Sequence, residues 1–123
     1  MQLNANMLFV YLTILFTCYG QLILKWRLID LGRTNPSFNG NFSSILSLLF
    51  DPFVLSGLGA AFFAALSWMY ALTKFPLSKI YPLVSFSFLI VLVFSALFFN
   101  ESVSKTNLIG CLVIVLGTYL AVR

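Results

Sequence analysis

Residues 8–28 read LFVYLTILFTCYGQLILKWRL, an apolar stretch with a cation, Lys25, near its end. A helix of about 20 apolar residues crosses the hydrocarbon of a bilayer, so this stretch predicts a first transmembrane helix. It ends at Trp26 and Arg27, an aromatic and a basic side chain typical of the headgroup region. No basic region followed by a small-residue cleavage site precedes it, so we expect a retained helix rather than a signal peptide.

The composition extends this prediction to the whole chain. Of its 123 residues, 61% are hydrophobic and 8% are charged, whereas a soluble domain carries about 25% charged residues. We therefore predict an all-α membrane protein, a single four-helix transmembrane domain over residues 1–123. The net charge of +4 comes from few residues spread along the chain, which is typical of anchoring at the membrane surface. We expect no nucleic-acid partner.

Three further apolar stretches predict the remaining spans, at about residues 53–73, 80–99 and 108–122. Between the first and second spans, residues 42–50 place apolar side chains at helical spacing, with serines on the other side. This segment is too short to span and stops at Asp51 and Pro52, so we predict a short interfacial helix.

Short connections and small residues predict how the helices pack. Residues 74–79 form a very short link, so the second and third spans are expected to be an antiparallel hairpin. Pro82 is expected in the first turns of the third span, where its missing N–H is tolerated. Small residues in the second span predict close helix approach. Gly110 and Gly117 share one face of the fourth span and predict a close helix pair, the candidate dimer interface.

The basic residues leave the orientation in the membrane open. Three lie on the side of the N-terminus and four lie on the other side, and this bias is nearly neutral by the positive-inside rule. The first group is Lys74, Lys79 and Arg123, and the second is Lys25, Arg27, Arg33 and Lys105. A balanced count fits dual insertion and an antiparallel dimer, and equally a topology set by a partner subunit.

A polar stripe follows the first span, because Thr13, Thr17, Gln21 and Lys25 recur every four residues. It drifts by about 40° per step and should face protein or water. Gln21 and Lys25 are neighbours on adjacent turns, and together they can hold a phosphate oxygen. The position of Lys25 is explained equally well by a lysine beside Trp26 whose ammonium extends (snorkels) to the headgroup region. The Gln21 amide needs a partner, which a purely structural interhelical hydrogen bond would also provide.

The start of the third span offers a second group of polar side chains. Tyr81 and Ser85 share a helix face, and Ser78 and Lys79 lie near the interface, so a sugar headgroup would find partners there. An aromatic belt at a helix start explains the same residues.

Glu101, just beyond the third span, is expected to pair with Lys105 or to cap the fourth helix. The chain has no His, and Cys18 and Cys111 belong to different predicted helices, where we expect reduced thiols. No base is placed to activate a Ser or Thr within a span. We therefore expect no catalytic residues, no metal site and no cofactor.

The segments GQLILK at 20–25, PLSKIYPLVSFSF at 76–88 and FFNESVS at 98–104, with the glycine-spaced fourth helix, resemble the small multidrug resistance branch of the drug/metabolite transporter superfamily. The resemblance covers almost the whole chain. Within that branch the chain looks most like the subunits proposed to flip aminoarabinose-phosphoundecaprenol. The drug exporters of the branch carry a membrane-embedded Glu where this sequence has Thr17, so proton/cation antiport of the usual kind is not expected.

The resemblance implies a flippase, not an enzyme, that moves a polyprenyl-phosphate-linked monosaccharide across the bacterial inner membrane for cell-envelope glycan or lipopolysaccharide modification. The candidate substrate-binding residues are Lys25, Gln21, Thr17, Tyr81, Ser85, Lys79, Arg27 and Glu101. Four helices are too few to enclose a pathway with two gates, so we expect a homodimer or a heterodimer with a similar small subunit. Two alternatives stay open: an exporter of small cations or drugs, and a non-transporting assembly subunit of a membrane glycosyltransferase.

Overall fold

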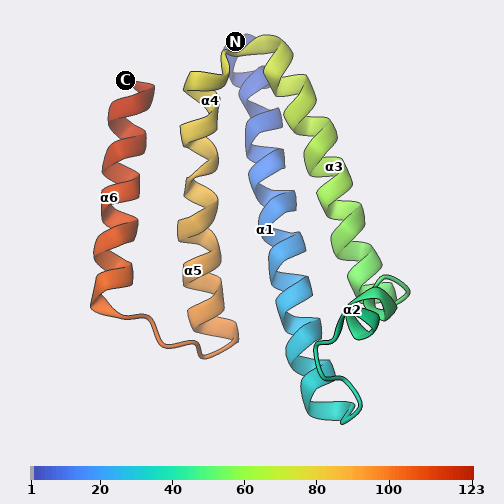
Figure 1. Cartoon of the computed structure of the whole chain (residues 1–123). Coiled ribbons are helices and arrows are strands. Elements are labelled where there is room, and N and C mark those ends of the chain that lie inside the picture. Colours follow the sequence, from blue (N-terminus) through green and yellow to red (C-terminus); the bar gives the residue numbers. More distant parts are fainter. Residues whose placement is uncertain (1) are drawn as a thin grey trace.

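The computed structural model describes residues 2–123, with side chains from residue 5 onward. Four of its helical segments are long and apolar enough to cross a membrane, namely Ala5–Thr34, Pro52–Lys74, Leu77–Phe98 and Lys105–Val122. The described chain holds helices and no strand, so the predicted all-α membrane fold with four spans is confirmed. Both chain ends lie at the same end of the bundle, as four crossings require (Figure 1).

Helix α1 runs over Gln2–Thr34 and continues beyond the predicted end at residue 28. Polar contacts stabilise its last turns, because Arg27 pairs with Asp30 at 2.7 Å and the Thr34 hydroxyl donates to the Asp30 carbonyl at 2.9 Å. Pro36 disfavours helical backbone at the residue before it, which is Asn35, and the helix ends there. The end of α1 therefore projects past its neighbours, at the bottom of Figure 1.

Helix α2, Phe42–Leu48, is the predicted short helix, and it ends two residues before the predicted boundary at residue 50. The side chains of Phe42 and Phe50 are 76% and 85% exposed, while Leu48 is buried. This outward apolar surface suits the predicted position at a membrane interface. Asp51 then starts α3, Pro52–Lys74, by accepting a hydrogen bond from the backbone N–H of Phe53 at 3.1 Å.

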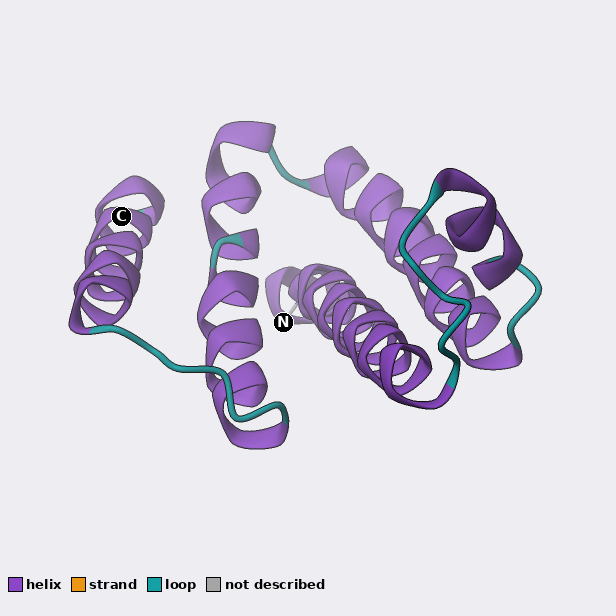
Figure 2. Ribbon diagram, turned by 60° about the horizontal axis from the view of Figure 1, so that its bottom comes forward, coloured by secondary structure: helices purple, strands orange, loops and turns teal. Residues whose placement is uncertain are grey.

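The centre of the bundle is α1, which lies between α3 on one side and the third span on the other (Figure 2). Helices α1 and α3 cross at two buried glycines. A Cβ on Gly20 would lie 3.1 Å from the Gly57 carbonyl oxygen, and a Cβ on Gly57 would lie 2.7 Å from Cγ2 of Ile23. The predicted hairpin of the second and third spans is antiparallel, but its two helices pack mainly on α1 rather than on each other.

The third span, Leu77–Phe98, begins three residues before the predicted start at residue 80 and is divided at Ser85 into α4, Leu77–Val84, and α5, Phe86–Phe98. The division follows from Pro82, which has no N–H for the helical hydrogen-bond ladder. The backbone N–H of Ser85 instead donates to the Pro82 carbonyl at 3.0 Å, an i to i+3 bond. The Thr118 hydroxyl donates to the Ile114 carbonyl of its own helix at 2.8 Å and also lies 3.3 Å from the Pro82 carbonyl, so the last helix contacts the division.

Helix α6, Lys105–Val122, forms one edge of the bundle and packs on α4 and α5 (Figure 1). Its first turn is capped by Ser104, whose hydroxyl accepts from the Asn107 N–H at 3.1 Å. No described atom outside the helix backbone lies within 4 Å of a Cβ built on Gly110 or Gly117. One chain therefore leaves the predicted dimer face of α6 uncovered.

Candidate functional site

A groove of about 430 Å³ lies between α1, α3 and the junction of α4 with α5. We name this the central groove. Its polar lining consists of Thr13, Thr17, Gln21, Tyr81 and Ser85. Its apolar lining consists of Gly20, Leu24, Gly57, Leu58, Ala61, Ala64, Ala65, Trp68, Val84 and Phe88. The structure thus brings four of the predicted site residues, Thr17 and Gln21 from α1 with Tyr81 and Ser85 from the third span, to one surface.

The four-residue spacing on α1 explains the polar side of the groove. Thr13 is buried, and its hydroxyl donates to the carbonyl of Phe9 at 2.8 Å, so its own helix satisfies it. The four predicted site residues that line the groove differ from Thr13. Their side-chain hydroxyl and amide groups make no hydrogen bond to any group in the part of the chain whose side chains the structure describes. Amide and hydroxyl groups are therefore available to a ligand.

An aromatic side chain that sequence reasoning did not single out completes the groove. Trp68 of α3 lies edge-on to Tyr81, with ring centroids 6.1 Å apart. Ala61 and Ala65 precede it on the groove side of α3 and leave room in front of the ring. The small residues of this helix predicted close packing with a neighbouring helix, and this holds at Gly57. The alanines before Trp68 also form one side of the groove.

Lys25 lies one turn beyond Gln21 and forms an ion pair with Glu101, with 3.3 Å between Nζ and Oε1. Neither residue is part of the groove lining. The expectation that Glu101 pairs with Lys105 or caps α6 was wrong, because Ser104 is the cap and Glu101 reaches α1. Asn100, with a left-handed φ of 52°, turns the chain directly before Glu101.

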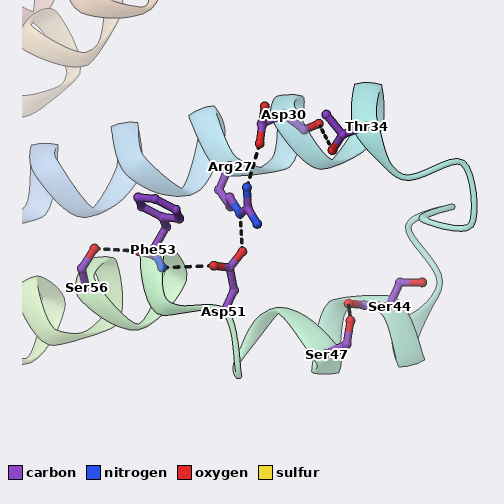
Figure 3. Close-up of polar contacts among 8 residues, drawn as sticks. All are labelled: Arg27, Asp30, Thr34, Ser44, Ser47, Asp51, Phe53 and Ser56. Atoms are coloured by element: carbon purple, nitrogen blue, oxygen red, sulfur yellow. Dashed lines mark hydrogen bonds and ion pairs between the residues drawn. The ribbon is translucent and has the colours of Figure 1, made fainter.

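Arg27 is bound by two acids, Asp30 and Asp51 (Figure 3), and does not line the central groove. Its Nη1 lies 2.7 Å from Asp30, its Nε donates to Asp51, and the guanidinium carbon lies 5.3 Å from the centre of the Phe53 ring. The hydrogen bond from Arg27, together with that from the Phe53 N–H, holds the pKa of Asp51 below its ordinary value. Arg27 therefore joins the end of α1 to the start of α3.

Charged side chains occur near the ends of the central groove rather than in its lining. Lys25 and Glu101 lie beyond its α1 side. Lys79 is exposed on α4, two residues before Tyr81, and does not line the groove. The structure therefore does not bring Lys79 or Arg27 to the other predicted site residues. The groove is an uncharged, mainly apolar surface with a few polar groups, and the charges lie beyond it.

Comparison with known proteins places the chain among transporters. Residues 4–123 match the EamA-like transporter family. The chain is 34% identical, over 94% of its length and 95% of the relative's, to the probable 4-amino-4-deoxy-L-arabinose-phosphoundecaprenol flippase subunit ArnE of Aeromonas salmonicida. It is 30% identical to the probable flippase subunit ArnF for the same lipid in Photorhabdus laumondii, over 91% of the chain and 92% of the relative. No solved structure matches the chain.

Proposed function

Because the chain belongs to the EamA-like transporter family, we propose that it flips a polyprenyl-phosphate-linked monosaccharide across the bacterial inner membrane, for modification of cell-envelope glycan or lipopolysaccharide. The observation that carries the proposal is nearly full-length similarity to probable flippase subunits for one such lipid. The central groove supports it, because its unoccupied hydroxyl and amide groups match the hydroxyls of a sugar.

The sugar would be held from two sides of the groove. Gln21 on α1 and the pair Tyr81 and Ser85 on the third span offer hydrogen bonds, while Trp68 and Phe88 offer apolar surface to the ring. The volume of about 430 Å³ suits a headgroup rather than a long isoprenoid. The polyprenyl tail would therefore remain in the lipid beside the bundle.

The phosphate is assigned to Lys25, which follows Gln21 on the same stripe. A lysine ammonium binds phosphate as a point charge and needs no fixed fork geometry. Arg27 is committed to Asp30 and Asp51 and takes no part. Lys79 lies two residues before Tyr81 on α4, and we assign it to the headgroup at the other end of its path.

A second subunit would complete the pathway, as either a homodimer or a heterodimer. The uncovered glycine face of α6 is the surface we assign to this partner, since small residues let two membrane helices approach closely. Two related halves that rock about a central site would expose the groove to each side in turn.

An exporter of small cations would need a carboxylate that binds protons and cations competitively, and no acid lines the groove within the described residues. Proton release from the purified protein on addition of toxic cations would contradict the flippase proposal. A non-transporting assembly subunit would tolerate Lys25→Ala without loss of sugar modification, but would not tolerate disruption of the α6 face.

The direct test is lipid flipping in proteoliposomes that contain the full chain and its partner subunit. The probe is a prenyl phosphate carrying 4-amino-4-deoxyarabinose, and an impermeant amine-reactive reagent reports how much of it reaches the outer leaflet. Tyr81→Phe removes a hydroxyl from the groove and should slow flipping by about two- to tenfold, the range for one lost hydrogen bond. Tyr19→Phe is the matched control, because the Tyr19 hydroxyl contacts Ser56 outside the groove. Equal rates in the two variants, or no flipping by the wild type, would contradict the proposal.

A further inference from the structure

The ion pair between Lys25 and Glu101 joins two separate elements, α1 and the loop between α5 and α6. The two side chains are 51% and 44% exposed. Lys25 lies beside Trp26 and Arg27 at the predicted headgroup boundary, where water and lipid headgroups solvate both charges when they separate, so an ion pair this exposed contributes little to folding stability. The pair can therefore open at small cost when another ion of suitable charge arrives.

The other acids of the chain are not available in this way. The chain has three acids, and two of them, Asp30 and Asp51, are bound to Arg27. Glu101 is the acid that is paired with a lysine instead. Lys25 lies one helical turn beyond Gln21, which lines the central groove, so a headgroup that leaves the polar lining on this side meets a cation and an anion together.

Given the proposed headgroup role of the groove, we propose that Lys25 and Glu101 form a two-charge receptor for a zwitterionic sugar phosphate. The Lys25 ammonium binds the phosphate that links the sugar to the lipid, and the Glu101 carboxylate binds a cationic amine on the sugar ring. Binding separates the two side chains and replaces one ion pair by two. Because each charge keeps a counter-charge, neither the headgroup nor the protein is left with an unpaired ion.

This arrangement selects between sugars. The phosphate of a sugar without an amine also attracts Lys25. It places a negative charge next to the Glu101 carboxylate, and the sugar has no positive charge to pair with that carboxylate. Like charges at close range oppose binding, so Glu101 rejects purely anionic headgroups while it attracts amino-sugar headgroups. Removal of the Glu101 charge should therefore move the two affinities in opposite directions, which a merely structural role of Glu101 would not do.

The experiment measures binding of two lipids to the full chain in nanodiscs, in the assembly that the chain forms. One probe is a short prenyl phosphate carrying 4-amino-4-deoxyarabinose, and the other is the same lipid with its amine N-acetylated. Trp68 lines the groove and reports binding by fluorescence, in a Trp26→Phe background, since Trp26 packs against Phe53 outside the groove. Glu101→Gln is compared with Asp30→Asn, which removes a carboxylate from the same end of the bundle.

Glu101→Gln should weaken binding of the amino lipid by about fivefold and strengthen binding of the acetylated lipid, whereas Asp30→Asn should leave their ratio unchanged. The double variant Lys25→Glu/Glu101→Lys, which keeps both charges, should recover part of the preference for the amino lipid. Parallel shifts of both lipids in Glu101→Gln would overturn the two-charge receptor and leave the proposed function intact. Failure of the wild type to bind either lipid would overturn the proposed function as well.

Discussion

Two single charged side chains on α1 connect the end of this helix to its neighbours. Arg27 satisfies Asp51 at the point where Asp51 also caps α3, so one carboxylate holds a helix start and an interhelical contact together. Lys25, two residues earlier, faces the loop after α5 instead. Two cations that lie two residues apart on α1 thus serve different purposes: Arg27 links two helices through Asp51, and Lys25 forms an exposed ion pair that can open.

The link between Arg27 and Asp51 predicts a difference between two substitutions of Asp51. Asp51→Asn keeps a good helix cap and loses the charge, while Asp51→Ala loses both, so the thermal unfolding temperature in detergent should fall in the order wild type, Asn, Ala. The pKa of Asp51 is lowered in the folded state, so its stabilising effect is present above its unfolded pKa and is lost as the pH falls through the folded value. The gap between wild type and Asp51→Asn should therefore shrink below about pH 4. A gap that widens in acid would contradict this assignment.

At the scale of elements, the spans were predictable and their internal irregularities were not. Long apolar runs identify a transmembrane helix without knowledge of its neighbours, which is why α3 and α6 agree with their predicted spans to within three residues, while α1 extends six residues beyond its predicted span at each end. The division at Ser85 depends on Pro82 and on the packing of α6 beside it, where the Thr118 hydroxyl lies 3.3 Å from the Pro82 carbonyl. The contact between Lys25 and Glu101 depends on where a loop ends in space, and no sequence spacing encodes it.

The candidate site shows the same limit. The stripe on α1 was visible because Thr17 and Gln21 recur at a helical period, and the pair Tyr81 and Ser85 was visible for the same reason. That these two pairs face one groove follows only from the packing of α1 against the third span. Trp68 was missed because an aromatic residue in a membrane helix has many ordinary explanations.

The crossing of α1 and α3 gives a prediction with an internal control. Gly57→Ala would place a Cβ 2.7 Å from Cγ2 of Ile23 and force that side chain to move, so it should destabilise the protein by about 1–3 kcal/mol. Gly59→Ala, two residues away, meets nothing within 4 Å and should be neutral or slightly stabilising. Thermal unfolding of both variants in one detergent compares them. A larger loss in Gly59→Ala would mean that the helices do not cross at Gly57.

At the scale of the whole molecule, α6 is the least buried of the four spans. Its side chains Leu112, Leu116 and Leu120 are 64%, 63% and 69% exposed, and its glycines meet nothing in the same chain. In a bilayer such a surface is compatible with lipid, but four helices with one central groove do not make two gates. We therefore assign the uncovered face to the second subunit.

The double variant Gly110→Leu/Gly117→Leu tests this assignment. It should weaken subunit association by about tenfold or more, equivalent to about 1.4 kcal/mol, because the larger side chains keep the two helices apart. Folding of the single chain should be nearly unaffected, since both positions are open within it. Cross-linking yield and mass in detergent measure the association. Gly59→Leu is the matched control, and a larger loss of association there would move the interface to α3.

The uncharged lining of the central groove determines how the membrane voltage acts on passage. One elementary charge that crosses 100 mV gains or loses about 2.3 kcal/mol. A headgroup with one phosphate and one ammonium has no net charge, and the lining residues add none. Transfer through this groove would be electroneutral, so the direction of flow would depend on the amounts of lipid in the two leaflets and on the reaction that consumes it.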